Sequence, residues 1–471
     1  MKKTKISALL CAAMLMGAAL PVGMPANAAD SGMRDITTME LVREMGIGIN
    51  LGNTYESCGD WIAQWGDGTP ESYETAWGSP VITQKMMQGY ADEGFGVVRV
   101  PVAWSNMMGE DYTISPAYLE AVREVVDWAL EADLYVILNI HWDGGWWENF
   151  PTDKENCMYK YTRIWTQLCE AFGSYGDHLM FESLNEEGGW SSLWNQYGGV
   201  TPGKAESFGL LNEINQTFVD LVRSSGGNNA KRHLLIAGYN TNFELTCDDL
   251  YEMPDDPENR CAVSVHYYTP ATFAILEQDA DWGKASSTWG TDAEFAELEF
   301  QMNLMETHFI KEGIPVIIGE YGCPTKNKEA DSVHLFLKSV AEEAYERQMC
   351  PVLWDTTDLH YSRTTCKLKD QELKAAFNAI TQSSAPETGM LGDVNQDGTI
   401  NAADAATILT AAAAVGSGAA SGLTAAQETA ADVDRDSDFD AADAAVVLQY
   451  AAELGTGSTM TLEEFLASIN S

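Results

Sequence analysis

Residues 315–322 read PVIIGEYG, a short apolar run that ends at a charged residue, Glu320. Seven other segments are also short apolar runs that end in a polar or aromatic residue: IGINLGN (47–53), VVRVP (97–101), YVILNIHW (135–142), LMFESLNEE (179–187), HLLIAGYN (233–240), AVSVHYY (262–268) and PVLWD (351–355). Helix-like stretches such as 117–129 and 331–347 lie between them. Because apolar strands that alternate with helices form a parallel sheet covered on both faces, the pattern predicts an α/β fold, a (β/α)8 TIM barrel, over residues 30–381. A doubly wound open sheet is the weaker alternative.

The composition of the chain limits the classes of partner and substrate that it can bind. The chain has 471 residues, with 27 Lys and Arg against 70 Asp and Glu, a formal net charge of −43. Nucleic acids and anionic lipids need a basic surface, so neither is expected as a partner, and a neutral substrate fits better. The 14 Trp offer flat apolar faces on which sugar rings stack.

The first residues have the form of a signal peptide. Lys2, Lys3 and Lys5 precede an apolar run over 6–20, and small residues follow up to Ala28. This is the pattern of a secretory signal with cleavage after Ala28. The run is shorter than the about 20 residues that span a bilayer. We therefore expect residues 1–28 to be removed and the protein to be secreted, without membrane insertion. The remaining cysteines have no spacing that assigns a disulfide, and free buried thiols fit equally well.

Polar side chains follow the apolar runs, and the two carboxylates among them stand out. In a TIM barrel the catalytic groups lie at the C-terminal ends of the strands. A single glutamate at such a place more often caps a helix or forms a salt bridge. Glu186 and Glu320 occur together, however, and the other strand ends carry more polar and aromatic groups. These are Asn53, Arg99, His141, Asn185, His266 and Trp354.

Two carboxyl groups at one barrel mouth suit the cleavage of a glycosidic bond. Carboxyl groups about 5–5.5 Å apart act as acid/base and nucleophile, and the anomeric configuration is retained. Arg99 would keep one carboxylate ionised, while that negative charge helps its partner to stay protonated. Tyr268 would donate a hydrogen bond to the ionised oxygen. The sequence has no metal-ligand cluster in this region, and we expect no cofactor in the catalytic site.

These residues resemble glycoside hydrolase family 5, a retaining (β/α)8 family best known for its cellulases. The resemblance covers about residues 38–380 and implies that Glu186, in LNE, is the acid/base and that Glu320, in IIGEYG, is the nucleophile. One departure is Glu187, which stands where the family usually has proline. Glu186 keeps the role of the acid because it follows the matching Asn185. The substrate-binding or supporting residues that the resemblance implies are Asn53, Arg99 (VRVP), His141 (NIHW), Asn185, His266 and Tyr268 (VHYY), and Trp354 (VLWD).

Five tryptophans lie in the two loops that follow the third and fourth predicted strands. A single tryptophan is more often a packing residue than a sugar platform. Five at the catalytic face make us expect that at least one stacks on a glucan chain. They are Trp142, Trp146, Trp147, Trp190 and Trp194.

The C-terminal region carries a duplicated calcium-loop pattern. The first copy places its ligands at Asp393, Asn395, Asp397, Thr399, Asn401 and Asp404; the second has Asp432, Asp434, Asp436, Asp438, Asp440 and Asp443. Oxygen ligands at these positions of a twelve-residue loop form an EF-hand-like site. A disordered acidic tail is the alternative, but two loops in register, each followed by an apolar helix, argue against it. We therefore predict two bound calcium ions.

The duplicated loops resemble a dockerin, the all-α calcium module that attaches a cellulase to a cohesin domain of a scaffold protein. The resemblance covers residues 391–456. Ala402 and Ala403, with their counterparts Ala441 and Ala442, occupy the positions where dockerins carry recognition residues. Residues 382–390 are predicted to be a linker, and 457–471 a tail with one helix.

Together these features predict a secreted, cellulosomal endo-β-1,4-glucanase that hydrolyses β-glucan with retention. The expected location is extracellular, on a cell-surface cellulosome of an anaerobic bacterium. A family 5 mannanase, xyloglucanase or xylanase with the same mechanism is the first alternative. A catalytically inactive carbohydrate-binding protein is the second, and the presence of both glutamates argues against it.

Overall fold

A computed structural model of the chain describes residues 32–198, 203–383, 391–395, 399–417, 421–423, 425–434, 438–455 and 460–469. The predicted signal peptide, the linker positions 384–390 and the predicted calcium ligands Asp397 and Asp436 lie outside the described residues.

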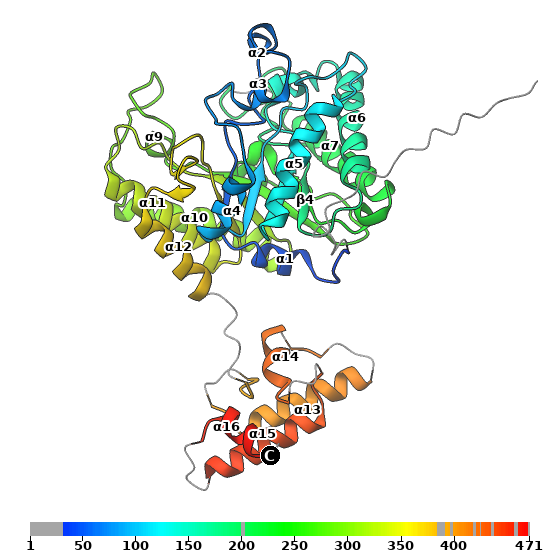
Figure 1. Cartoon of the computed structure of the whole chain (residues 1–471), viewed down its shortest axis with the longest axis vertical. Helices are drawn as coiled ribbons and strands as arrows, with labels where there is room; N and C mark the ends of the chain where they lie inside the picture. Colours follow the sequence, from blue (N-terminus) through cyan, green and yellow to red (C-terminus); the bar gives the residue numbers. More distant parts are fainter. Residues whose placement is uncertain are drawn as a thin grey trace, which may run out of the picture.

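Eight parallel strands form a closed barrel, in which β1 pairs with both β2 and β8. Helices such as α4, α5 and α11 lie around its outside (Figure 1). The predicted (β/α)8 barrel is confirmed, and closure excludes the open doubly wound sheet. The strands are β1 (Gly48–Asn50), β2 (Val97–Val100), β3 (Tyr135–Asn139), β4 (Leu179–Glu182), β5 (Leu234–Ala237), β6 (Cys261–Tyr267), β7 (Val316–Tyr321) and β8 (Cys350–Leu353).

Helices surround this barrel and bury a continuous apolar layer against its outer face. The α-helices of this region are α1 (Thr38–Glu44), α2 (Asp60–Trp65), α3 (Pro70–Glu74), α4 (Gln84–Asp92), α5 (Pro116–Glu131), α6 (Lys154–Phe172), α7 (Lys204–Ser224), α8 (Phe243–Thr246), α9 (Ala271–Ala274), α10 (Asp292–His308), α11 (Ala330–Glu346) and α12 (Gln371–Ser383). The 3-10 helices are η1 (Asp143–Asn149), η2 (Gly227–Ala230), η3 (Tyr239–Thr241) and η4 (Ile310–Glu312), and a hairpin of β9 (Tyr361–Ser362) and β10 (Lys367–Leu368) precedes α12.

The interior of the barrel changes from apolar to polar along the strands. Because side chains alternate between the two faces of a strand, residues two apart point the same way. Ile137 lies in the apolar cluster that α1 closes from below, and Asn139, two residues on, is a buried polar residue. Met180 and Glu182 repeat this order on β4. The polar layer thus lies at the C-terminal ends of the strands.

A bulge between β6 and β7 sets the register at the mouth of the barrel. Val265 pairs with Ile318, but the next residue, His266, pairs with Glu320, so that Gly319 is passed over. A Cβ atom on Gly319 would lie 3.1 Å from the His266 Nε2 atom, closer than neighbours normally allow. The glycine and the bulge together bring His266 opposite Glu320.

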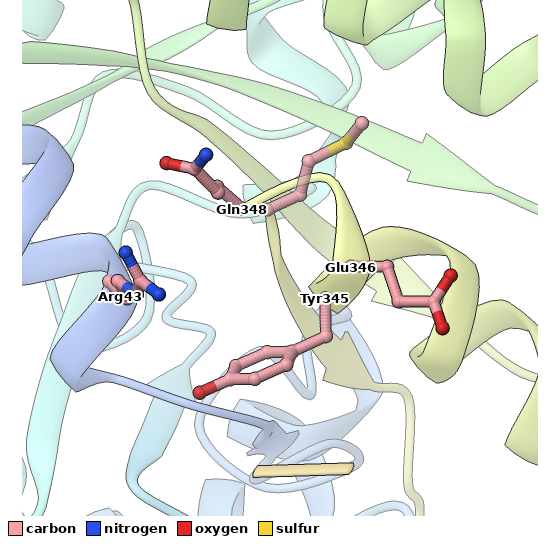
Figure 2. Close-up of a pocket in the computed structure, with 5 residues that line it drawn as sticks. Arg43, Tyr345, Glu346 and Gln348 are labelled. Atoms are coloured by element: carbon pink, nitrogen blue, oxygen red, sulfur yellow. The ribbon is translucent and has the colours of Figure 1, made fainter. Parts of the chain in front are cut away.

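The N-terminal end of the barrel lies opposite this mouth. There the side chain of Thr381, in the last turn of α12, lies 3.6 Å from the Cβ position of Gly46, just before β1. A small pocket of about 120 Å³ also opens at this end, between α1 and the end of α11 (Figure 2). Arg43, Tyr345 and Glu346 are among its lining residues.

The C-terminal region has an apolar core of its own. Its helices are α13 (Ala402–Gly416), α14 (Ala425–Ala431), α15 (Ala441–Gly455) and α16 (Leu462–Ile469). Ile408 of α13 and Val447 of α15 are buried in this core, and Phe465 of α16 packs its ring 5.6 Å from that of Tyr450. Among all the described helices of the chain, none is both long and apolar enough to cross a bilayer.

Candidate active site

Arg99 is the centre of the polar layer. Its guanidinium group is fully buried and donates to four neighbours. Nε lies 2.7 Å from Glu182 Oε2, and Nη1 lies 2.8 Å from Glu320 Oε1. The other two bonds go to Asn50 Oδ1 (3.0 Å) and Asn185 Oδ1 (2.8 Å). A buried guanidinium with two carboxylate partners keeps its charge, so Arg99 is a fixed cation beneath the mouth.

Glu320 is held by donors on both of its oxygens. Arg99 donates to Oε1, and the Tyr268 hydroxyl donates to Oε2 at 2.9 Å. His266 Nδ1 lies 3.7 Å from Oε2, and His141 Nε2 lies 4.0 Å from Oε1. The Glu320 side chain is only 7% exposed. Its carboxyl group therefore has one orientation, with both oxygens turned to donors.

Glu186 faces Glu320 across His266. The His266 Nδ1 atom forms a 2.8 Å hydrogen bond with Glu186 Oε1. Carboxylate oxygens of Glu186 and Glu320 lie within 4.8 Å of each other. The Glu186 side chain is 47% exposed, so it is the carboxyl group that a ligand entering the mouth would meet.

The two carboxyl groups titrate as a pair. Burial raises the pKa of Glu320, although the charges of His266 and Arg99 act in the opposite direction. Burial also acts to raise the pKa of Glu186, but the hydrogen bond and charge of His266, together with Arg99, outweigh it and lower this pKa. Interacting carboxyl groups of this kind lose their protons in two separated steps. These opposite directions favour a proton on Glu320 and a charge on Glu186 before a sugar binds.

His141 and Trp354 form a stacked pair beside Glu320. Their rings are nearly parallel, with an angle of 5° between planes and 5.8 Å between centroids. Burial and the charge of Arg99 lower the pKa of His141 well below its usual value, so the ring is neutral. The indole of Trp354 is partly exposed. It can offer one face to a ring bound in the mouth.

Asn53 is the predicted site residue that the structure does not join to this cluster. It follows β1 with a φ of 56°, and its backbone N–H donates to the Glu56 carboxylate. Among the described residues its side chain makes no hydrogen bond with Glu186 or Glu320. The β1 residue that reaches Arg99 is Asn50, three residues earlier.

Sequence reasoning did not assign three members of the polar layer to the site. Asn50 also donates from Nδ2 to the Gly319 carbonyl at 2.9 Å, which ties β1 to β7. Glu182 accepts from Arg99 and from the Ser264 hydroxyl, at 2.8 Å. Ser264 and Glu182 both lie two residues beyond apolar, inward-facing positions of their strands. That spacing is the signal that would have found them.

Glu187 does not reach the catalytic mouth. Its side chain is 1% exposed, and its Oε2 atom has no hydrogen-bond partner within the described part of the chain. Burial raises its pKa well above the usual range, and the negative charges of Glu186 and Glu182 add to this. Glu187 is therefore a neutral, buried acid, and Glu186 is the carboxylate beside Glu320.

The tryptophans expected to form a cleft differ in exposure. Trp190 and Trp147 are buried, and Trp146 and Trp194 are partly buried. Trp142 is 42% exposed and meets the ring of Trp147 edge to face.

Comparison with known proteins identifies the family. The family model for cellulase, glycosyl hydrolase family 5, matches residues 63–359, and that for the dockerin type I domain matches residues 391–450. The chain belongs to glycosyl hydrolase family 5. It is a glycoside hydrolase that carries a C-terminal dockerin.

Relatives of this glycoside hydrolase share most of its length. Endoglucanase B of Clostridium cellulovorans is 32% identical over 401 residues, which are 82% of this chain and 86% of the relative. A xyloglucan-specific endo-beta-1,4-glucanase of Bacteroides ovatus is 34% identical over 355 residues, 71% of this chain and 68% of the relative. The solved structure of a GH5-4 broad specificity endoglucanase from an uncultured bovine rumen ciliate covers 74% of this chain and 99% of its own, with a TM-score of 0.67 and 36% identity.

The two loops of the dockerin are organised alike. The Asp404 carboxylate accepts from the backbone N–H groups of Asn395 (3.0 Å) and Asn401 (2.9 Å). Asp443 does the same in the second loop, with Asp434 (3.1 Å) and Asp440 (2.8 Å). The last ligand of each loop therefore closes the loop onto its own backbone.

The donor atoms of the dockerin loops suit calcium. Carboxylate oxygens of Asp432, Asp434 and Asp443 lie within 4.8 Å of one another, and so do those of Asp438, Asp440 and Asp443. Calcium prefers such sets of oxygen ligands. In the first loop, Asn401 Nδ2 donates to the Thr399 hydroxyl at 2.9 Å. Dockerin type I domains bind calcium, and the residues present in this chain fit the ion.

Proposed function

We propose that this glycoside hydrolase is a retaining endo-β-1,4-glucanase of a cellulosome, with Glu186 as acid/base and Glu320 as nucleophile. The observation that carries the proposal is the separation of the two carboxyl groups. Their oxygens lie within 4.8 Å of each other. Retaining enzymes need this short separation, of about 5–5.5 Å, whereas inverting enzymes leave room for a water molecule between the groups.

In the first step Glu186 donates its proton to the glycosidic oxygen while Glu320 attacks the anomeric carbon. The bond to the leaving sugar breaks, and a covalent glycosyl–enzyme forms. A sugar that covers Glu186 removes this carboxyl from water, which raises its pKa and favours the protonated acid. Burial raises the pKa of Glu320, but Arg99 and Tyr268 both donate to it and act in the opposite direction. Once the bound sugar shifts the proton of the pair to Glu186, these two donors hold Glu320 as the carboxylate.

In the second step a water molecule attacks the same carbon from the side that the leaving sugar has vacated. Glu186, now ionised, accepts a proton from this water, and Glu320 is released as a carboxylate. His266 donates to Glu186 in this form and holds it in place. Two inversions at one carbon give net retention.

The remaining residues position the substrate and the pair. Asn185 and Arg99 join the loop that carries Glu186 to the base of the mouth. Trp354 supports the sugar ring at the scissile bond by stacking one face of its indole on the sugar. The other face of the indole lies against His141. An endo-acting glucanase is favoured because the relatives are named as endoglucanases.

Xyloglucan is the second candidate substrate, since one relative is xyloglucan-specific. Activity on cellulose, lichenan, xyloglucan, glucomannan and xylan separates these possibilities. Proton NMR of the first product tests the mechanism: the β-anomer must appear first, and an α-anomer would rule out retention. A chain without activity on any of these polymers would instead be a carbohydrate-binding protein.

The dockerin places the enzyme on a scaffold outside the cell. It binds two calcium ions through the ligands of its two loops and, once folded, docks to a cohesin. The negative charge of the dockerin loops supports a role for calcium in folding, because carboxylates gathered this closely repel one another until a cation is bound. Export follows from the predicted signal peptide, and the enzyme works on the surface of an anaerobic bacterium.

A further inference from the structure

Three side chains at the catalytic mouth lie close enough together to hold one metal ion. The carboxylates of Glu186 and Glu320 and the imidazole of His266 each place one ligand atom within 4.8 Å of the other two. Glu186 follows β4, His266 lies on β6 and Glu320 lies on β7. Because the three residues come from different strands, no spacing along the sequence indicates this group. It forms only because the strand ends converge.

The separations of the ligand atoms suit a small divalent ion. Zinc binds imidazole nitrogen and carboxylate oxygen at about 2.0–2.2 Å, in a tetrahedron whose ligand atoms lie roughly 3.4 Å apart. His266 Nδ1 lies 3.7 Å from Glu320 Oε2, which is close to that separation. The same Nδ1 atom lies 2.8 Å from Glu186 Oε1. Only this second distance has to widen, by roughly half an ångström, when zinc enters.

Two of the three ligands are held in place, and the third can adjust. The side chains of His266 and Glu320 are buried. Tyr268 can keep its hydrogen bond to Glu320 Oε2, because a carboxylate oxygen has room for a donor and an ion. The Glu186 side chain is about half-exposed and can rotate to complete the site. A site that is largely preformed binds its ligand at a lower entropic cost.

The tautomer of His266 is not fixed by a hydrogen bond on its far side. The Nε2 atom is buried and has no hydrogen-bond partner among the residues that the structure describes. A histidine binds a metal through one nitrogen while the other carries the ring proton. His266 can therefore place its proton on Nε2 and turn the bare Nδ1 atom toward an ion between the two carboxylates.

The charge and the chemistry of the ligands select the ion. Three carboxyl groups, those of Glu182, Glu186 and Glu320, surround the single guanidinium group of Arg99. Zinc needs ligands without protons, so its binding releases protons to water and leaves a net negative charge to hold the ion. Imidazole is a good ligand for zinc, whereas calcium prefers oxygen ligands alone. Calcium therefore belongs in the dockerin loops, and zinc fits the mouth of the barrel.

We propose that Glu186, His266 and Glu320 bind one Zn²⁺ ion, which reversibly inhibits the enzyme. The ion is not a cofactor. It occupies the acid and the nucleophile at once, so that neither can act on a glycosidic bond, and zinc and substrate exclude each other. The inhibition rests on the proposed function, because it takes Glu186 and Glu320 as the catalytic pair, but the binding of zinc does not.

Binding is measured on the full chain with Co²⁺ as a probe, in excess calcium so that the dockerin loops are filled. Cobalt in a four-coordinate site of nitrogen and oxygen ligands absorbs visible light more strongly than the hydrated ion, and zinc should displace it. We expect one ion per chain. His266→Gln and, separately, Glu186→Gln should each weaken binding at least about tenfold. If His266→Gln has a much lower melting temperature, Glu186→Gln decides, because its half-exposed side chain is not needed for packing.

His334→Gln is the matched control. His334 also pairs with a carboxylate, that of Asp370, at 2.7 Å. Within the described part of the chain no further ligand completes a metal group at this pair. The control should bind cobalt and zinc as the wild-type enzyme does, so that a loss in the site variants cannot be assigned to the removal of any histidine–carboxylate pair.

Inhibition is measured on an aryl cellobioside with a good leaving group, on which Glu186→Gln is expected to stay active. Zinc should raise the KM of the wild-type enzyme, calcium at the same concentration should not, and EDTA should restore the rate. Glu186→Gln should need at least about tenfold more zinc for half-inhibition.

A wild-type enzyme without a cobalt band, or binding that is unchanged in both site variants, would overturn the zinc site. Binding that leaves the KM of an active enzyme unchanged would overturn the inhibition. A chain that is inactive on every glycoside would refute the proposed function, whereas the cobalt titration would still decide whether the three residues bind the ion.

Discussion

Removal of one hydroxyl group should shift the pH profile of this enzyme in a known direction. Tyr268 donates to Glu320 Oε2 at 2.9 Å, and this bond acts to lower the pKa of Glu320. As the proposed nucleophile, Glu320 must be ionised to attack the anomeric carbon. In Tyr268→Phe the carboxyl keeps the Arg99 bond on Oε1 but loses its donor on Oε2, so it stays protonated up to a higher pH.

The size of the shift follows from the strength of the bond. A hydrogen bond to a charged group contributes about 1.5–3 kcal/mol, and one pKa unit corresponds to about 1.4 kcal/mol. The Glu320 side chain is 7% exposed, so water cannot replace the lost donor well. The acid limb of kcat/KM should therefore move upward by roughly one to two pH units, with a smaller loss on the alkaline side of the profile.

The assay is kcat/KM for an aryl cellobioside between pH 4 and 8, alongside the melting temperature of each variant. Tyr267→Phe is the control, because Tyr267 is the neighbouring residue on β6 and its buried hydroxyl has no hydrogen-bond partner among the residues that the structure describes. The control should keep the wild-type profile. An acid limb of Tyr268→Phe that is unmoved, or that moves to lower pH, would refute this account of how Glu320 is kept ionised.

Further changes test the other parts of the molecule. Glu320→Gln should lose nearly all turnover on every substrate and keep its melting temperature within a few degrees; substantial residual turnover would exclude it as the nucleophile. Glu186→Gln should retain far more activity on aryl glycosides with good leaving groups than on polysaccharide, and equal losses on both would contradict its role as the acid. Trp354→Ala should lower kcat/KM about 2- to 12-fold, as expected for a lost aromatic contact of about 0.5–1.5 kcal/mol; unchanged activity with a lower melting temperature would make it a packing residue. Treatment of the full chain with EDTA should abolish cohesin pull-down but spare activity on a soluble substrate, and a pull-down indifferent to EDTA would argue against calcium-dependent docking.

The barrel was predictable because its signal is local and repeated. Each of the eight apolar runs became a strand, since a strand covered on both faces must be apolar along its whole length. The polar residues at the ends of these runs could be predicted to lie at the mouth of the barrel for the same reason. Glu186 and Glu320, far apart in the sequence, meet because all eight strands end at one mouth.

The inner layer of the site was harder to read from the sequence. Glu182 and Ser264 lie within strands, where a polar residue in an apolar run gives no sign of its direction until the inward face is known. The bulge that pairs His266 with Glu320 is a shift in register between β6 and β7, so it cannot be predicted from the sequence of either strand alone. Trp190 is buried because its N–H finds the carbonyl of Trp147 in another loop, and composition does not show such a partner.

The place where the barrel domain ends has a consequence for how the enzyme works on a scaffold. The last turn of α12, with Thr381, lies beside Gly46 and therefore at the N-terminal ends of the strands, the end away from Glu186 and Glu320. The described part of the catalytic domain thus ends at its back. Anchoring through the dockerin then does not require the chain to pass over the cleft, and a long or insoluble polysaccharide can approach the open face while the enzyme stays attached.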